Sequence, residues 1–104
     1  MLRVSKDNFQ KEVLESTTVV VADFWATWCM PCKMMEPILD QIAEEHGENV
    51  KIAKVDVDEE PELATQFNIV SIPSLLVFHK GEKVGGHTGV VSQSVLNGMI
   101  KDYL

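Results

Sequence analysis

The sequence lacks several features that would assign it to particular classes of protein. Basic residues are few: 9 Lys and Arg against 16 Asp and Glu give a formal net charge of −7. This negative charge argues against electrostatic binding to nucleic acid or to anionic membranes. No apolar run is long enough to span a bilayer, and residues 1–7 contain no apolar stretch of the kind found in signal peptides. We therefore expect a cytoplasmic protein.

The chain also lacks internal repeats, low-complexity tracts and any Gly- or Pro-rich linker. Its 104 residues suit one domain, and a chain with 45% apolar and 24% charged residues has a globular composition. We expect a single domain over residues 1–104, with a monomer as the default oligomeric state.

Helical and strand patterns alternate at short intervals, which is typical of an α/β domain. Strands are predicted over residues 1–4, 18–26, 50–57, 74–79 and 83–88, and helices over about 5–15, 30–46, 58–67 and 92–103. The element order is β-α-β-α-β-α-β-β-α. Residues 18–26 are apolar on both alternating faces, which indicates a central strand covered by helices on both sides.

Helix ends also carry signals. Gly47 is expected just beyond the second helix, and Ser92 is expected to cap the last one. Helical spacing predicts the inward face of that last helix to be Val95, Leu96, Met99, Ile100 and Tyr103.

Cysteine is scarce, and its spacing is informative. The only two cysteines stand three residues apart in Trp28-Cys29-Met30-Pro31-Cys32, so a helix would place both on nearly the same face. Cys29 falls where a strand ends and a helix begins, and the unpaired N–H groups and partial positive charge there favour thiolate over thiol. Pro31 suits a first helical turn. We expect Cys29 to be exposed and activated, and Cys32 to be more buried.

This spacing predicts dithiol–disulfide exchange, in which one thiolate attacks a foreign disulfide and the second thiol releases the product. A zinc site is the first alternative, but it needs about four ligands, and the His residues show no zinc-site spacing. Haem attachment would need His where Lys33 stands. A purely structural disulfide would restrain the unfolded chain little, because its loop is so short.

Two charged residues interrupt apolar strands. Burial of Asp23 should raise its pKa, and the group could accept the Cys32 proton directly or through water. The alternative is a structural aspartate satisfied by local hydrogen bonds. Lys54 could approach Asp23 if their strands are neighbours, although its position alone favours a lysine that extends into solvent from a strand edge.

The residues near the cysteines and Asp23 allow less specific predictions. Trp28 could contact a substrate or simply pack in the core. Met30 should be exposed and could contact varied partners, whereas Met34 is expected to pack. The Ile72–Pro73 bond is expected to be trans from the sequence alone, because only about 5–6% of X–Pro bonds are cis.

Together these segments resemble the thioredoxin family over nearly the whole chain. The matching residues are Val21-Ala22-Asp23-Phe24-Trp25-Ala26-Thr27-Trp28-Cys29-Met30-Pro31-Cys32-Lys33, Pro37-Ile38-Leu39, Lys54-Val55-Asp56, Ile72-Pro73-Ser74-Leu75 and Phe78-His79-Lys80-Gly81. The resemblance implies a thioredoxin-like fold, in which helices flank both faces of a central mixed sheet, and protein-disulfide oxidoreductase activity.

For the reacting centre, the resemblance implies that Cys29 is the nucleophile and Cys32 the resolving thiol, and that the two form a redox-active disulfide. It makes Asp23 the buried carboxylate and Lys54 its neighbour. It also implies that Pro73 is cis and faces the cysteines, which overrides the trans expectation.

For partners, the resemblance implies disulfide-containing protein substrates that contact Trp28, Met30 and Pro31, and whose backbone pairs with Ile72 beside Pro73. It places Gly89 on the same surface. It implies no bound cofactor and no metal: electrons come from NADPH through a separate thioredoxin reductase, and this chain shows no nucleotide-binding motif.

One residue departs from the family pattern. Met30 stands where glycine is usual, and residues between the cysteines tune the redox potential and the fit to a reductase. General disulfide reduction is the leading functional hypothesis. An oxidant or isomerase with a less reducing potential is the second, and a binding subunit whose cysteines are not essential is the third.

Overall fold

Five strands form one sheet in the order β1-β3-β2-β4-β5. The computed structural model describes residues 1–104. Its strands are β1 (Leu2–Arg3), β2 (Val19–Trp25), β3 (Val50–Asp56), β4 (Ser74–His79) and β5 (Glu82–Thr88). β1 and β2 run parallel to β3, whereas β4 runs antiparallel to both β2 and β5. The sheet is therefore mixed, as predicted.

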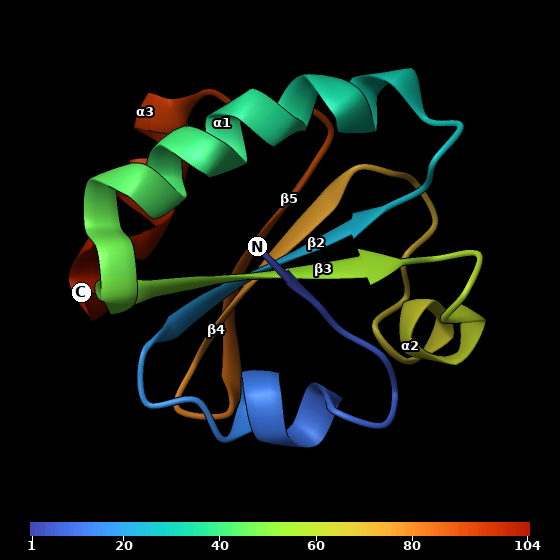
Figure 1. The fold of residues 1–104 in the computed structure, drawn as a ribbon, viewed down its shortest axis with the longest axis horizontal. Helices are drawn as coiled ribbons and strands as arrows, with labels where there is room; N and C mark the ends of the chain where they lie inside the picture. Colours follow the sequence, from blue (N-terminus) through green and yellow to red (C-terminus); the bar gives the residue numbers. More distant parts are fainter.

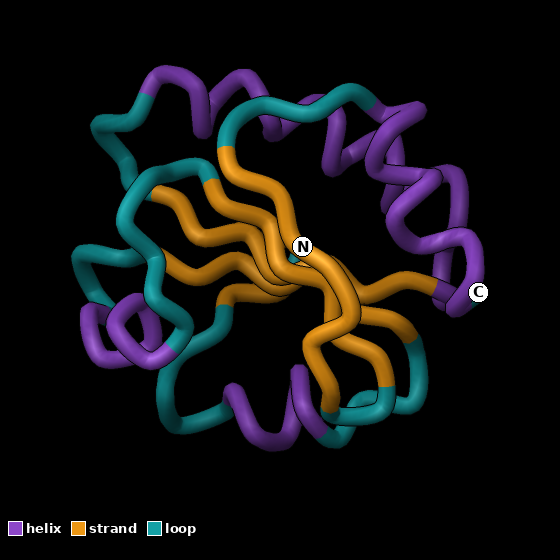
Figure 2. The backbone as a smooth tube through the Cα atoms, turned by 180° about the vertical axis from the view of Figure 1, so that it is seen from behind, coloured by secondary structure: helices purple, strands orange, loops and turns teal.

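Helices cover both faces of this sheet. The helical elements are η1 (Gln10–Leu14), α1 (Met30–His46), η2 (Gly47–Asn49), α2 (Pro61–Gln66), α3 (Gln93–Ile100) and η3 (Lys101–Tyr103). In Figure 1, α1 and α3 lie above the sheet, with η1 and α2 below it. Figure 2 shows the same three layers from behind.

The core consists of two apolar layers, one on each face of β2. Val19 and Val21 pack with residues of α1 and α3, whereas Val20 and Phe24 pack with residues of η1 and α2. Every residue from Val19 to Phe24 is buried. Period-two alternation along the strand thus assigns each β2 side chain to one layer, which fixes where a polar residue of this strand must point.

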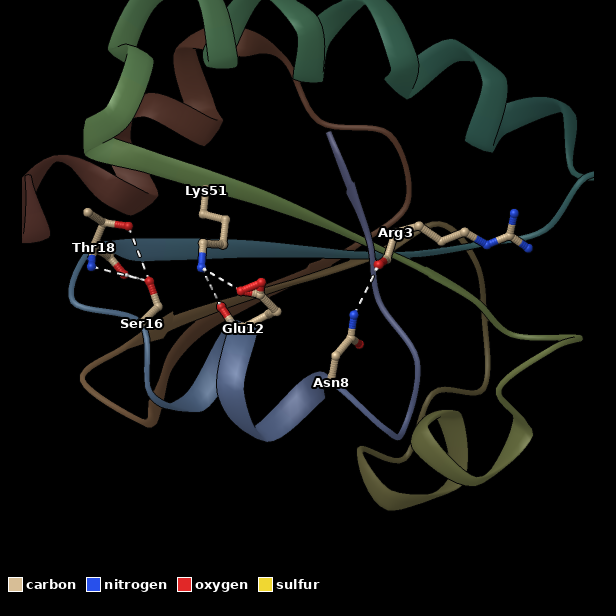
Figure 3. A network of polar contacts seen from close by, with 6 residues as sticks. All are labelled: Arg3, Asn8, Glu12, Ser16, Thr18 and Lys51. Carbon is tan, nitrogen blue, oxygen red and sulfur yellow. Dashed lines mark hydrogen bonds and ion pairs between the residues drawn. The ribbon is translucent and has the colours of Figure 1, made fainter.

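The first predicted helix is shorter than expected. Its regular part is the π-helical turn η1, in which the N–H of Glu15 donates to the carbonyl of Gln10, five residues back, at 2.9 Å. Figure 3 shows how this turn is tied to the sheet: Lys51 of β3 donates to the Glu12 carbonyl at 2.9 Å. The same figure shows Asn8 beside the carbonyl of Arg3 in β1.

α1 and α3 begin where local signals predict, although α3 ends at Ile100, before the turn η3. α1 ends at His46 and is followed by Gly47 at φ +55°, a conformation that glycine adopts without strain. Ser92 caps α3, accepting the N–H of Val95 at 3.1 Å. One inward residue was predicted wrongly: Val95 is 50% exposed, because the buried stripe of this short helix is centred on Leu96 and Ile100.

Candidate active site

The two cysteines stand at the point where β2 leads into α1. Cys29 is the residue immediately before the first helical residue, Met30, and its Sγ accepts the backbone N–H of Cys32 at 3.2 Å. Pro31 lies in the first turn, where its missing N–H leaves no helical bond unmade. The sulfur of Cys29 therefore satisfies a free amide at the positive end of a 17-residue helix, an arrangement that stabilises negative charge on sulfur.

Cys29 and Cys32 form a disulfide, with their Cα atoms 5.3 Å apart. Cys32 is 1% exposed, in agreement with prediction, but Cys29 is only 4% exposed, so the expectation of an exposed Cys29 is wrong for this oxidised form. The disulfide directs the Cys29 sulfur toward Cys32, and both cysteines pack in a small cluster with Ala26 that Trp25 and Ile72 partly cover.

Asp23 is the buried carboxylate of the site. Asp23 lies two residues after Val21 on β2, so both side chains lie on the face of the sheet that α1 covers. None of the surface of Asp23 is exposed. Lys54 occupies the registered position on the neighbouring strand β3, and its Nζ lies 2.8 Å from Asp23 Oδ2. Asp23 Oδ1 has no hydrogen-bond partner, and Oδ2 has only this ion pair.

The protonation of Asp23 reflects two opposing effects. Burial raises the pKa of Asp23 above its ordinary value, and the positive charge of Lys54 lowers it, with burial the larger influence. A carboxyl group of this kind can take up a proton at a pH where an exposed aspartate cannot.

Lys54 is buried, although its sequence position alone favoured a side chain that extends into solvent. Only 8% of the residue is exposed, and its Nζ lies 4.8 Å from the centroid of the Trp25 ring. The lysine does not extend into solvent because β3 lies inside the sheet, between β1 and β2, with α1 packed above it. The proximity of Lys54 to Asp23 that the resemblance implies is confirmed.

Sequence reasoning missed a second acid here. Glu36 of α1 forms an ion pair and a hydrogen bond with Lys54. Its position four residues after Cys32 was visible in the sequence, because residues at that spacing share a helix face. Its partner was not visible, since that depends on how α1 crosses β3.

The loop before β4 also packs against the cysteines. The Ile72–Pro73 peptide bond is cis, which confirms the resemblance and corrects the expectation from sequence alone. Ile72 packs against the cluster that contains Cys29 and Cys32. Gly89, at φ +93°, donates its N–H to the Pro73 carbonyl at 2.8 Å, so the loop after β5 supports the loop before β4.

Trp28 is held in place at the rim of the site. Its indole N–H donates to Asp58 Oδ2 at 2.8 Å, while the residue remains 69% exposed. The sequence did not reveal Asp58, because this residue lies in the loop after β3. The hydrogen bond thus holds the ring in place, and most of the residue's surface stays open to solvent.

The surface beside the cysteines is apolar. Met30 is 67% exposed as predicted, but Met34 is 58% exposed, so its expected role in packing is wrong. Val70 is 95% exposed. A pocket of about 180 Å³ adjoins this surface, lined by Trp28, Val57, Ala64, Ile69, Val70, Ser71 and Ile72. An apolar side chain flanking a substrate cysteine would fit such a surface.

No three His, Cys, Asp or Glu side chains gather in a way that could hold a metal ion. No helix has both the length and the apolar character needed to cross a membrane.

The fold and site define a class of protein: a dithiol–disulfide oxidoreductase in which a helix-capping cysteine and its partner face a cis-proline loop. Comparison with known proteins supports this assignment to the oxidoreductases. The family model described as Thioredoxin matches residues 1–102. This chain is 42% identical over 101 residues to Thioredoxin 1 of Synechococcus elongatus, covering 97% of this chain and 94% of the relative. It is 40% identical over 104 residues to Thioredoxin of Acidithiobacillus ferridurans, covering 100% of this chain and 96% of the relative.

A third relative, Thioredoxin 1 of Nostoc, is 40% identical over 102 residues, covering 98% of this chain and 95% of the relative. The chain belongs to the thioredoxin family. Its activity is dithiol–disulfide exchange at the cysteine pair at the start of α1.

Proposed function

We propose that this protein is a general reductase of protein disulfides in the cytoplasm, with Cys29 as nucleophile and Cys32 as resolving thiol. One observation carries the assignment of roles: Cys29 Sγ accepts a free amide at the start of α1, whereas Cys32 lies inside the first turn. The sulfur that this amide and the helix N-terminus stabilise as an anion is the one suited to attack.

In the first step, the Cys29 thiolate attacks one sulfur of a substrate disulfide. The substrate S–S bond breaks, a Cys29–substrate disulfide forms, and the other substrate sulfur leaves as a thiolate that takes a proton from water. Electrons are conserved at this stage, because one disulfide has replaced another.

In the second step, Cys32 passes its proton to Asp23, directly or through water, and attacks Cys29 Sγ. The mixed disulfide breaks, the second substrate sulfur is released, and the Cys29–Cys32 disulfide forms. The substrate gains two electrons and the protein loses two. The raised pKa of Asp23 supports this role, because burial makes it a better proton acceptor than an exposed aspartate. Lys54 acts as a positioning residue that keeps the buried carboxylate paired.

Substrate binding is assigned to the apolar rim. Trp28, Met30 and Pro31 are exposed next to Cys29, and a substrate backbone pairs with Ile72 beside Pro73. Gly89 supports this loop through its hydrogen bond to Pro73 and lines the same surface.

For recycling, a thioredoxin reductase returns two electrons from NADPH to the Cys29–Cys32 disulfide, and this chain itself binds no cofactor. We propose that residues 1–104 act as a single domain and as a monomer. The two apolar layers share the central strand β2, which supports one cooperative unit.

The experiment is NADPH-coupled reduction of insulin disulfides with several purified thioredoxin reductases. Turnover is expected for the unaltered protein and none for Cys29→Ser. Cys32→Ser should accumulate a stable mixed disulfide with the substrate, visible by mass spectrometry. A Cys29→Ser variant with full turnover, or one that accumulates a substrate adduct on Cys32, would reverse the assignment of roles. A potential well above that of the glutathione couple would favour the oxidant hypothesis instead.

A further inference from the structure

Glu36 is a charged residue of the site that the two-cysteine mechanism does not use. It lies one helical turn after Cys32 on α1, and its side chain reaches the sheet, where it pairs with Lys54. The side chain is 38% exposed, whereas Asp23 is fully buried and the Lys54 side chain is 9% exposed. Glu36 is therefore the only member of this acid–lysine–acid row in substantial contact with water.

The row follows from the register of the sheet. Asp23 and Lys54 are paired positions on parallel strands, and both project from the face that α1 covers. α1 crosses above them and brings Glu36 to the far side of the ammonium group. Lys54 thus lies between two carboxylates that come from different elements of the chain.

A single lysine cannot fully neutralise two carboxylates. In a site sheltered from water, each ionised acid competes for the same positive charge, and the charge on one acid disfavours ionisation of the other. Burial is the largest influence on the pKa of Asp23 and raises it, Lys54 lowers it, and the negative charge of Glu36 adds a smaller increase.

We propose that Glu36 is a positioning residue for the resolving step: by sharing Lys54 it keeps Asp23 able to accept the Cys32 proton. This inference rests on the proposed role of Asp23. A base works best when its proton affinity matches the working pH. Glu36 opposes the effect of Lys54 on Asp23 and adds to the larger effect of burial.

Other groups around Asp23 offer no substitute for Glu36. From β3 the facing group is Lys54, and from α1 the ionisable groups are Glu36 and the cysteines, with Cys32 as the proton donor. From β4 the registered residue is the apolar Leu75. His87 of β5 pairs with Leu75 rather than with Asp23 and is exposed to solvent.

The test compares three substitutions that each remove one charge: Glu36→Gln, Lys54→Gln and Glu44→Gln. Glu44 is exposed on the same helix, two turns further on, and serves as the matched control. The readout is the titration of the Asp23 carboxyl carbon, followed by NMR in the oxidised protein, together with the pH profile of the resolving step in single-turnover experiments.

Glu36→Gln is expected to move the Asp23 midpoint to lower pH, and Lys54→Gln to move it to higher pH. Glu44→Gln should leave it in place. The pH profile of the resolving step should follow the Asp23 midpoint in each variant. These opposite shifts separate an electrostatic role from a merely structural one, which would change stability without a directed change in titration. If Lys54→Gln does not fold, the half-exposed Glu36 substitution and its control decide the question.

An Asp23 midpoint that is the same in Glu36→Gln and the unaltered protein would overturn the inference while leaving the proposed function intact. An Asp23→Asn variant that resolves the mixed disulfide at the normal rate and pH profile would instead remove Asp23 from the mechanism. In that case a shifted midpoint in Glu36→Gln would still show the charge coupling, but its role in the resolving step would be refuted.

Discussion

Lys54 lies between Asp23 and Glu36 and is the only cation within ion-pairing distance of either carboxylate. Asp23 comes from β2, Lys54 from β3 and Glu36 from α1, so the pairing depends on how three elements pack. Asp23 is fully buried, and this burial raises its pKa, which leads to the first prediction.

Asp23→Asn should make the oxidised protein relatively more stable as the pH rises. Burial raises the pKa of Asp23 in the folded state, so between its unfolded and folded pKa values the folded protein holds more protons than the unfolded chain. The free energy of unfolding of the unaltered protein therefore falls as pH increases through this window, by at most about 1.4 kcal/mol per pH unit for one proton. Asn cannot titrate, so the variant lacks this loss. Urea denaturation from pH 4 to pH 9 measures the difference, and parallel curves would contradict it.

Val70→Ser should weaken the binding of protein substrates without affecting the fold. Val70 is 95% exposed beside Trp28 and the apolar pocket, so its side chain contributes almost nothing to the core. Loss of about 1 kcal/mol of apolar contact should raise KM for insulin by roughly fivefold, with kcat nearly unchanged.

A small aromatic disulfide, reduced by the same cysteines, should be little affected by Val70→Ser because it covers less of the rim. Val95→Ser is the matched control, since Val95 is 50% exposed on α3 and outside this pocket. Equal effects of the two substitutions on KM would indicate that Val70 has no specific contact with substrate.

Asp58→Ala should free the indole of Trp28. The hydrogen bond between the two is exposed, so its loss should cost at most about 1 kcal/mol of stability. The ring should nevertheless become mobile, which would raise KM for protein substrates. NMR of the indole N–H would detect faster hydrogen exchange and a shifted resonance. Asp40→Ala, at an exposed position of α1, should leave the resonance where it is.

Ser92→Ala should destabilise the protein without altering catalysis. The substitution removes the side-chain acceptor for the N–H of Val95 at the start of α3, which typically costs about 1 kcal/mol. The melting temperature should fall by about 4 °C or slightly more. Ser94→Ala, inside the same helix, should leave the melting temperature nearly unchanged or raise it. A normal insulin-reduction rate for both variants would separate stability from activity.

Local features of the sequence predicted the framework well. α1 begins after Cys29 and ends before Gly47, because a capping position, an early proline and a glycine signal those boundaries within a few residues. β2 was recognisable as a central strand because a strand covered on both faces needs apolar residues at every position. Such signals act over one or two turns and need no knowledge of tertiary packing.

The main parts of the site that sequence reasoning missed depend on tertiary contacts. Lys54 was expected to reach solvent, but the packing of α1 over β3 buries it and adds Glu36 as a partner. Cys29 was expected to be exposed, but the disulfide and Ile72 cover it. The cis bond before Pro73 followed only from the family resemblance, because the local sequence favours trans.

The antiparallel pairing of β2 with β4 brings the residues after Trp25 and those before Ser74 to the same end of the sheet. The cysteine pair and the cis-Pro73 loop consequently meet at this end, while the strands carry the fold. Engineers could therefore exchange the exposed residues Val70 and Ser71 to redirect this protein toward new clients, without altering Ile72 at the cysteine cluster or Phe67 and Ile69 in the core.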